Sequence, residues 1–302
     1  MNKLLRSVGR SSAAILLAAA CMASAAELSI ADLCGDCRPE KVATCGGFLE
    51  GASVSPDGAL WILDLSGDRI INITDQGECA VRGKSGSTPN GSKFSSDGKM
   101  WITARSGLLT FDPKSGAVTV VVDQFAGKPL TGLNDLAFDK DGGLFFTAPE
   151  GSDYVKRDGR VFYLPPGAKV PVLVNDKIAF PNGIAATPDG RNVLVAEFAM
   201  KRVVSLPSPA AKGGLAVAYV YVNTQGGVGP DGIYVDAQGR LFTANLGAGE
   251  VLAFSADARP LGAIRLPDDA GKLVSNLVMR GGYLYFVEAQ KGEVWRVRMR
   301  GI

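Results

Sequence analysis

Residues 55–64 read SPDGALWILD, a turn that ends in Gly58 and is followed by a short apolar strand. The pattern recurs in SSDGKMWITA (95–104), DKDGGLFFTA (139–148), TPDGRNVLVAE (187–197), DAQGRLFTAN (236–245) and RGGYLYFVEA (280–289). The turn glycines follow one another at steps of 40, 44, 48, 49 and 43 residues. A period of this length, with several short strands in each unit, is typical of a β-propeller.

A further short strand is predicted after each of these segments. These strands are RIINI from Arg69, GLLTF from Gly107, RVFYL from Arg160, RVVSL from Arg202, EVLAF from Glu250 and EVWRV from Glu293. Each unit leaves room for one more strand, and no amphipathic helix interrupts the series. We therefore predict an all-β fold, a six-bladed β-propeller over residues 45–302. Residues 27–44 form an N-terminal leader that is available to add a strand to the last blade.

The first 26 residues have the features of an export signal. Basic residues precede an apolar run over 13–23, and small residues follow it. The run is too short to span a bilayer, so we predict a signal peptide over 1–26 and an exported protein, periplasmic or secreted, with no membrane segment after signal removal. Lipidation of Cys21 is an alternative, disfavoured because alanines occupy the three positions before it.

Charge and composition narrow the function classes. Removal of the signal takes away three basic residues and changes the formal net charge from +2 to −1. The charge therefore gives no indication of nucleic-acid binding. We expect a monomer that acts on a small-molecule substrate. The chain contains no histidine, which excludes Ser-His-Asp and Cys-His catalysis, HExxH zinc sites and His-ligated haem. Catalysis must use carboxylate, amide, thiol, Lys, Arg or Tyr groups, and any metal must suit oxygen ligands.

Four cysteines remain after export: Cys34, Cys37, Cys45 and Cys79. An even number in an oxidising compartment indicates disulfides. We prefer Cys34 with Cys37 and Cys45 with Cys79 among the three connectivities. A redox CxxC motif or a four-thiolate zinc site is the alternative, but the βαβ context and the zinc-ribbon spacing are missing.

A polar residue stands eight positions before five of the turn glycines: Glu50, Asn90, Asn134, Asn182 and Asp231. The sixth unit brings Ser275 or Asn276 to the equivalent place. First strands line the channel of a propeller, so these residues are predicted to form a polar ring at one mouth. The ring holds two carboxylates and no Lys or Arg, which favours a hard divalent cation, Ca²⁺ ahead of Mg²⁺. The alternative is that Asn-Gly and Asp-Gly are ordinary turn starters.

The loops that follow the second strands should surround this mouth, because second strands run back toward it. The third loop, APEGSDYVKRD over 148–158, is the longest. Its Glu150, Asp153, Tyr154 and Lys156 are candidates for substrate contact, and a solvated charged loop is the alternative.

Five motifs carry a resemblance to a known family: FLEGASVSPDG (48–58), GLNDLAFDKDGGLFFTAP (132–149), FPNGIAATPDG (180–190), GPDGIYVDAQGRLFTAN (229–245) and SNLVM (275–279). The chain resembles the senescence marker protein/gluconolactonase family, which includes calcium-dependent lactonases and squid-type diisopropyl fluorophosphatases. The resemblance implies a six-bladed propeller with a catalytic Ca²⁺. Its ligands would be Glu50, Asn134, Asn182 and Asp231, the residues that the repeat also indicates.

Three positions depart from the family pattern. Val278 stands where the fluorophosphatases carry a His near the metal, and Tyr234 stands where they carry an acidic ligand of a second calcium. Both changes disfavour a second ion and a phosphotriesterase. In gluconolactonases an Arg stands immediately before the Leu-Asn-Asp motif, whereas Gly132 stands there in this chain. This difference leaves the kind of lactone open.

We therefore expect hydrolysis of a lactone or ester at one Ca²⁺. Asp231 is the candidate base or nucleophile, and Asn90 and Ser275 would orient the substrate. The alternatives are a phosphotriesterase and a non-catalytic propeller that binds a ligand and keeps the calcium for rigidity.

Overall fold

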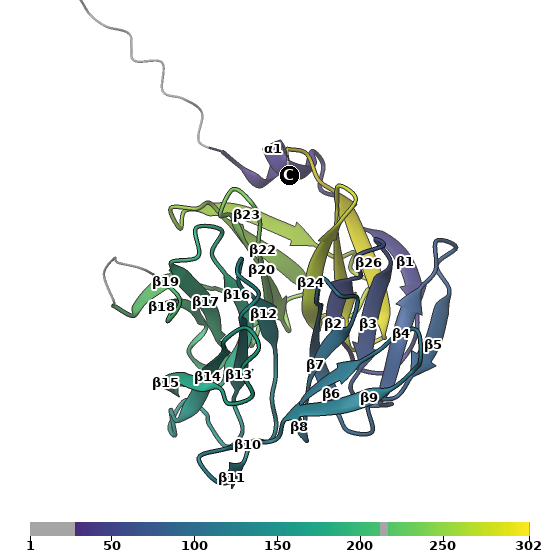
Figure 1. Cartoon of the computed structure of the whole chain (residues 1–302). Coiled ribbons are helices and arrows are strands. Elements are labelled where there is room, and N and C mark those ends of the chain that lie inside the picture. Colours follow the sequence, from purple (N-terminus) through teal and green to yellow (C-terminus); the bar gives the residue numbers. More distant parts are fainter. Residues whose placement is uncertain (1–27, 212–216, 302) are drawn as a thin grey trace, which may run out of the picture.

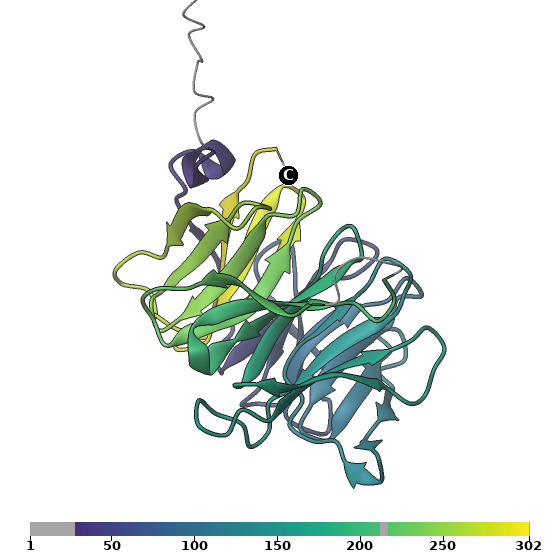
Figure 2. The same ribbon diagram turned by 90° about the vertical axis from the view of Figure 1, so that its left-hand side faces the viewer.

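The computed structural model of the chain describes residues 28–211 and 217–301. The signal peptide predicted over 1–26, with Cys21, lies outside the described residues. Within them, six four-stranded antiparallel sheets follow one another around a central axis (Figures 1 and 2), as the repeat predicts. No helix among the described residues is long and apolar enough to cross a membrane.

Blades 1 to 5 take their strands in chain order, from the axis outward. Blade 1 contains β2 (Leu49–Val54), β3 (Leu60–Asp64), β4 (Arg69–Ile73) and β5 (Cys79–Gly83). Blade 2 contains β6 (Pro89–Phe94), β7 (Met100–Ala104), β8 (Gly107–Phe111) and β9 (Val118–Val122). Blade 3 contains β12 (Leu136–Phe138), β13 (Leu144–Ala148), β14 (Gly159–Leu164) and β15 (Val172–Ile178). A small hairpin, β10 (Gln124–Phe125) with β11 (Lys128–Pro129), lies between blades 2 and 3 in the sequence.

The second half of the molecule repeats this plan. Blade 4 contains β16 (Pro181–Ala186), β17 (Asn192–Glu197), β18 (Arg202–Pro207) and β19 (Tyr219–Asn223), with a 3₁₀ turn η1 (Phe198–Met200) after β17. Blade 5 contains β20 (Gly229–Val235), β21 (Leu241–Leu246), β22 (Glu250–Phe254) and β23 (Pro260–Arg265). Blade 6 contains β24 (Val274–Arg280), β25 (Tyr283–Glu288), β26 (Glu293–Arg298) and, as its outer strand, β1 (Glu40–Thr44).

The repeated turn connects the first strand of a blade to the second. Gly58 has a φ of 85°, a left-handed conformation that glycine adopts without steric cost. The hydroxyl of Ser55, at the start of this turn, accepts a hydrogen bond from Ala59 N at 3.1 Å. The second strands of blades 1 and 3, β3 and β13, are buried at every position, which explains their nearly continuous apolar sequences.

The N-terminal leader closes the circle of six blades. Strand β1 pairs antiparallel with β26, with Glu40 opposite Arg296, so the N-terminal segment completes the blade formed by the C-terminal one. Residues 40–44 of the leader thus supply the outer strand of the last blade. Helix α1 (Ile30–Cys34) precedes β1 and lies beside the C-terminal end in both views (Figures 1 and 2), where Arg300 N donates to Leu33 O at 2.6 Å.

Both preferred disulfides form. Cys34 and Cys37 have Cα atoms 4.8 Å apart at the end of α1. Cys45 and Cys79 have Cα atoms 5.6 Å apart and join the segment after β1 to the outer strand of blade 1. The second bridge therefore ties the leader to the blade next to the closure.

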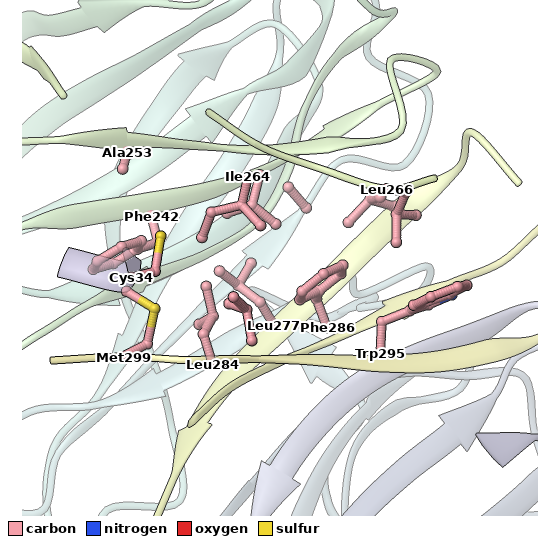
Figure 3. Close-up of a cluster of buried hydrophobic side chains, with 14 of the residues drawn as sticks. Cys34, Phe242, Ala253, Ile264, Leu266, Leu277, Leu284, Phe286, Trp295 and Met299 are labelled. Carbon is pink, nitrogen blue, oxygen red and sulfur yellow. The ribbon is translucent and has the colours of Figure 1, made fainter. Parts of the chain in front are cut away.

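Apolar side chains fill the spaces between neighbouring blades. Figure 3 shows the cluster between blades 5 and 6, where Phe242, Ile264, Leu284 and Phe286 are all fully buried. Burying a side chain of this size stabilises a fold by about 1.5–3 kcal/mol. The packing holds each blade against the next, which fixes where the first strands end around the axis.

Candidate active site and metal centre

The predicted ring residues lie at one end of the first strands. Glu50, Asn182 and Asp231 are buried, with 4%, 6% and 4% of their surfaces exposed, whereas Asn90 and Asn134 are half-buried. The strand register shifts next to the ring residue in the first strands of blades 1, 2, 4 and 5. A bulge of this kind turns the side chains at a strand end away from the regular alternation.

Hydrogen bonds and backbone contacts connect the ring from blade to blade. The hydrogen bonds are Ser92 Oγ to Gly51 O at 2.6 Å, Gly91 N to Asn134 O at 2.7 Å, Thr147 Oγ1 to Asn182 O at 2.8 Å and Ser275 Oγ to Leu49 O at 2.6 Å. Blades 4 and 5 meet where a Cβ on Gly183 would come within 2.3 Å of Asp231 O. The first strands are therefore too close at this level for side chains larger than glycine at most positions.

Two of the six blades do not have glycine at this close approach. Asp135 and Asn276 stand where the other blades carry Gly51, Gly91, Gly183 and Gly232. The glycine of the preceding blade leaves room for each of them: a Cβ on Gly91 would meet Asp135 Oδ1 at 2.5 Å, and one on Gly232 would meet Asn276 Nδ2 at 2.8 Å. Two further polar groups thus enter the axis, one residue past the ring.

Asp135 is a site residue that the sequence analysis missed. It is 2% exposed, and its carboxylate accepts hydrogen bonds from Leu136 N at 2.9 Å and Ile184 N at 3.4 Å, which links blades 3 and 4. In the sequence, Asp135 is marked by being an acidic residue at a position where most repeats have glycine. A pattern search for the eight-residue spacing does not detect it, because Asp135 stands one position later.

The buried carboxyl groups influence one another electrostatically. Burial, followed by the charges of Asp231 and Asp135, raises the pKa of Glu50 well above its ordinary value. Burial and the charge of Asp135 do the same to the pKa of Asp231. Burial also raises the pKa of Asp135, although the charge of Lys93 opposes this change. The site thus concentrates negative charge where water cannot screen it.

In the sixth blade, the structure shows which of Ser275 and Asn276 faces the ring. The Ser275 hydroxyl is fully buried and donates to Leu49 O, so the predicted contact between Ser275 and substrate is not supported. Asn276 instead faces the ring and donates from Nδ2 to Glu50 Oε2 at 3.5 Å. The serine therefore closes the circle of blades, and the asparagine orients a ring carboxylate.

The donor set fits an oxygen-liganded cation. Over residues 28–211 and 217–301, no three acidic or cysteine side chains form a metal-holding cluster by themselves, so a bound ion would also need the amide oxygens of Asn134 and Asn182. Neither Glu50 nor Asp231 has an ion-pair partner among the described residues. Buried carboxylates without basic partners are costly unless a cation compensates them. Carboxylate and amide oxygens are the ligands of Ca²⁺.

A cavity of about 270 Å³ opens above one side of the ring. The ring residues Asn90 and Asn134 line it, and the loops of blades 2 and 3 contribute Arg105 and Glu150. A larger cavity of about 600 Å³ lies along β22 and β23 and contains none of the ring residues. The smaller cavity is therefore the candidate substrate pocket, because it alone of the two reaches the polar ring.

The long loop of blade 3 contributes one of its predicted contacts. Glu150 lines the pocket and accepts a hydrogen bond from the Thr131 hydroxyl. Tyr154 is 66% exposed and does not line the pocket. Asp153 accepts the N–H groups of Val155 and Lys156, which lowers its pKa and shapes the loop.

The two positions that depart from the fluorophosphatase pattern are occupied by packing residues. Val278 is buried in the cluster that includes Tyr285 and Val287. Tyr234 packs against the cluster between blades 5 and 6. Burial, followed by the charge of Asp236, raises the pKa of the Tyr234 phenol. Tyr234 thus stands as a packing residue where a second calcium would need an acidic ligand, and Val278 places an apolar side chain where the fluorophosphatases carry imidazole.

A family model for the SMP-30/gluconolactonase/LRE-like region matches residues 48–281. The chain belongs to this family. The match covers the first five repeated turns and ends just after β24, and it includes each of the ring residues. The resemblance carried by the five motifs is thereby confirmed.

Curated members of the SMP-30/gluconolactonase family include proteins with lactonase names. A gluconolactonase of Zymomonas mobilis is 32% identical over 231 residues, which cover 70% of this chain and 63% of that protein. The chain thus matches less than two thirds of the length of this relative. The lactonase drp35 of Staphylococcus epidermidis is 26% identical over 248 residues, covering 78% of this chain and 74% of that protein.

Several solved structures share the fold. A gluconolactonase from Xanthomonas campestris superposes with a TM-score of 0.79 at 23% identity, covering 90% of this chain and 92% of its own. A calcium-binding regucalcin from Agrobacterium tumefaciens superposes with a TM-score of 0.70 at 19% identity, covering 86% and 96%. At these identities the likeness supports the six-bladed propeller and no finer conclusion.

Proposed function

We propose that this member of the SMP-30/gluconolactonase family is a calcium-dependent hydrolase of lactones or esters. The observation that supports the proposal is the ring of Glu50, Asn134, Asn182 and Asp231, from which Asn134 also lines a concave pocket. It combines the charge and the oxygen donors that Ca²⁺ needs with space for a small substrate.

A Ca²⁺ held by these four residues would polarise the substrate carbonyl and stabilise the oxyanion that develops on it. Asp231 is the candidate base or nucleophile, because the protein contains no imidazole for that role. As base it would take a proton from the attacking water, whose oxygen joins the carbonyl carbon, and would return that proton to the alcohol oxygen as its bond to the carbonyl carbon breaks. The carboxylic acid formed then releases its own proton to solvent. The products are a carboxylate and a hydroxyl group.

The surrounding residues hold this arrangement. A hydrogen bond from the Asn182 side chain opposes the rise in the pKa of Asp231 that burial and the charge of Asp135 cause. Asn276 donates to Glu50 and keeps that carboxylate directed at the ring. Asn90, half-buried on the pocket wall, is available to orient a polar group of the substrate.

Export is part of the proposal. Two disulfides within the described residues are compatible with folding in an oxidising compartment. Together with the charged and apolar N-terminal sequence, they support a periplasmic or secreted protein.

The Asp231→Asn variant tests the mechanism on a panel of lactones, esters and phosphotriesters, with calcium and with chelator. We expect the wild type to hydrolyse lactones or esters only with calcium. Asp231→Asn should lose at least about 100-fold in kcat, as is typical for removal of a general base. Asp176→Asn, an exposed carboxylate on β15, is the matched control and should keep full activity.

Calorimetric calcium binding separates the outcomes. If Asp231→Asn stays folded and binds calcium but has lost turnover, the catalytic role stands. If the wild type binds calcium and turns over nothing on the panel, the protein is a non-catalytic calcium-binding propeller. Turnover of phosphotriesters alone would also contradict the proposal.

A further inference from the structure

Gly132 has a backbone conformation and a neighbour that disfavour a side chain at this position. Its φ is 61°, and a Cβ there would lie 3.0 Å from the Cβ of Glu150. The Thr131 hydroxyl donates to the Glu150 carboxylate and so keeps Glu150 over this glycine. Gly132 and Glu150 both line the pocket at this point, and Glu150 supplies the side chain there.

Arg105 lies directly beside that position, on the loop between β7 and β8. Its carbonyl oxygen accepts a hydrogen bond from Gly132 N at 3.0 Å, and its own N–H donates to Thr88 O at 3.0 Å. Two hydrogen bonds from neighbouring segments thus fix the backbone of Arg105 at the pocket. Leu133 N also donates to Ala104 O, which keeps the two segments side by side.

The guanidinium group of Arg105 is free to bind a ligand. The residue is exposed, and within the described part of the chain its side chain has no ion pair or hydrogen bond. Among the described residues that line the pocket, it is the only basic one. A planar guanidinium group without a partner, at the wall of a concave pocket, is well suited to bind a carboxylate through two parallel hydrogen bonds.

We propose that Arg105 determines substrate specificity by binding a carboxylate of the substrate. The substrate class would be a hydroxylated lactone that carries a carboxylate outside the lactone ring, with Glu150 accepting hydrogen bonds from its hydroxyl groups. This inference rests on the proposed function, because it names the substrate of the same pocket.

The test compares two lactones of equal ring size, D-glucaro-1,4-lactone, which carries a carboxylate, and D-glucono-1,4-lactone, which does not. We expect the wild type to favour the first, and Arg105→Gln to lower kcat/KM for it by about tenfold or more, mainly through KM. The neutral lactone should change by less than about twofold, since no charge-assisted bond is lost. Arg82→Gln, an exposed arginine on β5, is the control and should leave both values unchanged.

Equilibrium binding distinguishes failure of this inference from failure of the hydrolase proposal. Calorimetry in the presence of calcium should show that the wild type binds D-glucarate more tightly than D-gluconate, and that Arg105→Gln removes the difference. This readout needs no turnover, so it remains decisive if no lactone is hydrolysed. Equal losses on both lactones, or an unchanged preference for glucarate in Arg105→Gln, would overturn the role of Arg105 while leaving the hydrolase proposal intact.

Discussion

Three carboxyl groups converge on the propeller axis, and one of them is not a predicted ligand. Asp135 lies one residue past the ring, yet its charge raises the pKa values of both Glu50 and Asp231. Such repulsion is unfavourable in the metal-free protein and favourable once a cation binds. Asp135 should therefore influence how strongly calcium stabilises the fold.

Asp135→Asn tests this at the residue scale. The wild type should melt at a clearly higher temperature with calcium than with chelator. The variant should show a smaller difference and bind calcium about tenfold more weakly, because a negative charge near the ion is lost. Thermal melts and calcium titration measure both effects, with Asp176→Asn as the control. An unchanged calcium affinity would mean that Asp135 only links blades 3 and 4.

At the scale of elements, buried acidic residues at the ends of second strands hold the loops around the mouth. Asp64, at the end of β3, accepts hydrogen bonds from Phe48 N at 3.0 Å, Ser66 Oγ at 2.7 Å and Arg69 Nε at 2.6 Å. Glu288, at the end of β25, accepts backbone N–H groups in the same way. These residues shape the site without belonging to the ring.

Asp64→Asn should destabilise the fold by about 1.5–3 kcal/mol near neutral pH, the usual contribution of hydrogen bonds to a charged group. Burial raises the pKa of Asp64, but hydrogen bonds from Ser66 and Arg69 outweigh it and leave the pKa below its ordinary value. A lowered pKa stabilises the folded state above the unfolded pKa, and this contribution is lost as the pH falls. Denaturant unfolding should therefore show a constant difference between wild type and variant from about pH 5 to 7, shrinking below about pH 4. A difference that does not depend on pH would contradict the ionised role of Asp64.

At the scale of the whole molecule, stability depends on how the circle of six blades is closed. Strand β1 completes blade 6, and the bridge between Cys45 and Cys79 ties the leader to blade 1. The two cysteines are 34 residues apart, whereas Cys34 and Cys37 are separated by only three. The longer loop gives the larger loss of unfolded-state entropy.

Replacing Cys45 and Cys79 together by serine should lower the free energy of unfolding by about 2–4 kcal/mol. The matched replacement of Cys34 and Cys37 should cost less. Denaturation in guanidinium chloride measures both changes. Equal effects of the two replacements would show that the closure does not depend on the longer bridge.

Much of the architecture could be predicted, because the turns and strands repeat along the chain. The DG turns and the apolar second strands depend on local sequence, and the eight-residue spacing located Glu50, Asn134, Asn182 and Asp231 at one level of the fold. Asp135 and Asn276 could not be assigned in this way. Their positions depend on bulged strand ends and on glycines in the preceding blade, which are contacts between blades.

The sequence by itself determined the six-bladed propeller, the polar ring and the absence of imidazole chemistry, since all three follow from residue types and their spacing. Only the tertiary structure decided that Ser275 closes the circle of blades while Asn276 faces Glu50, and that Tyr154 lies outside the pocket. It also placed Arg105 beside Gly132, although these residues belong to different blades. The physical reason is that the pocket is assembled from loops of several blades, and the packing of whole sheets sets their relative positions.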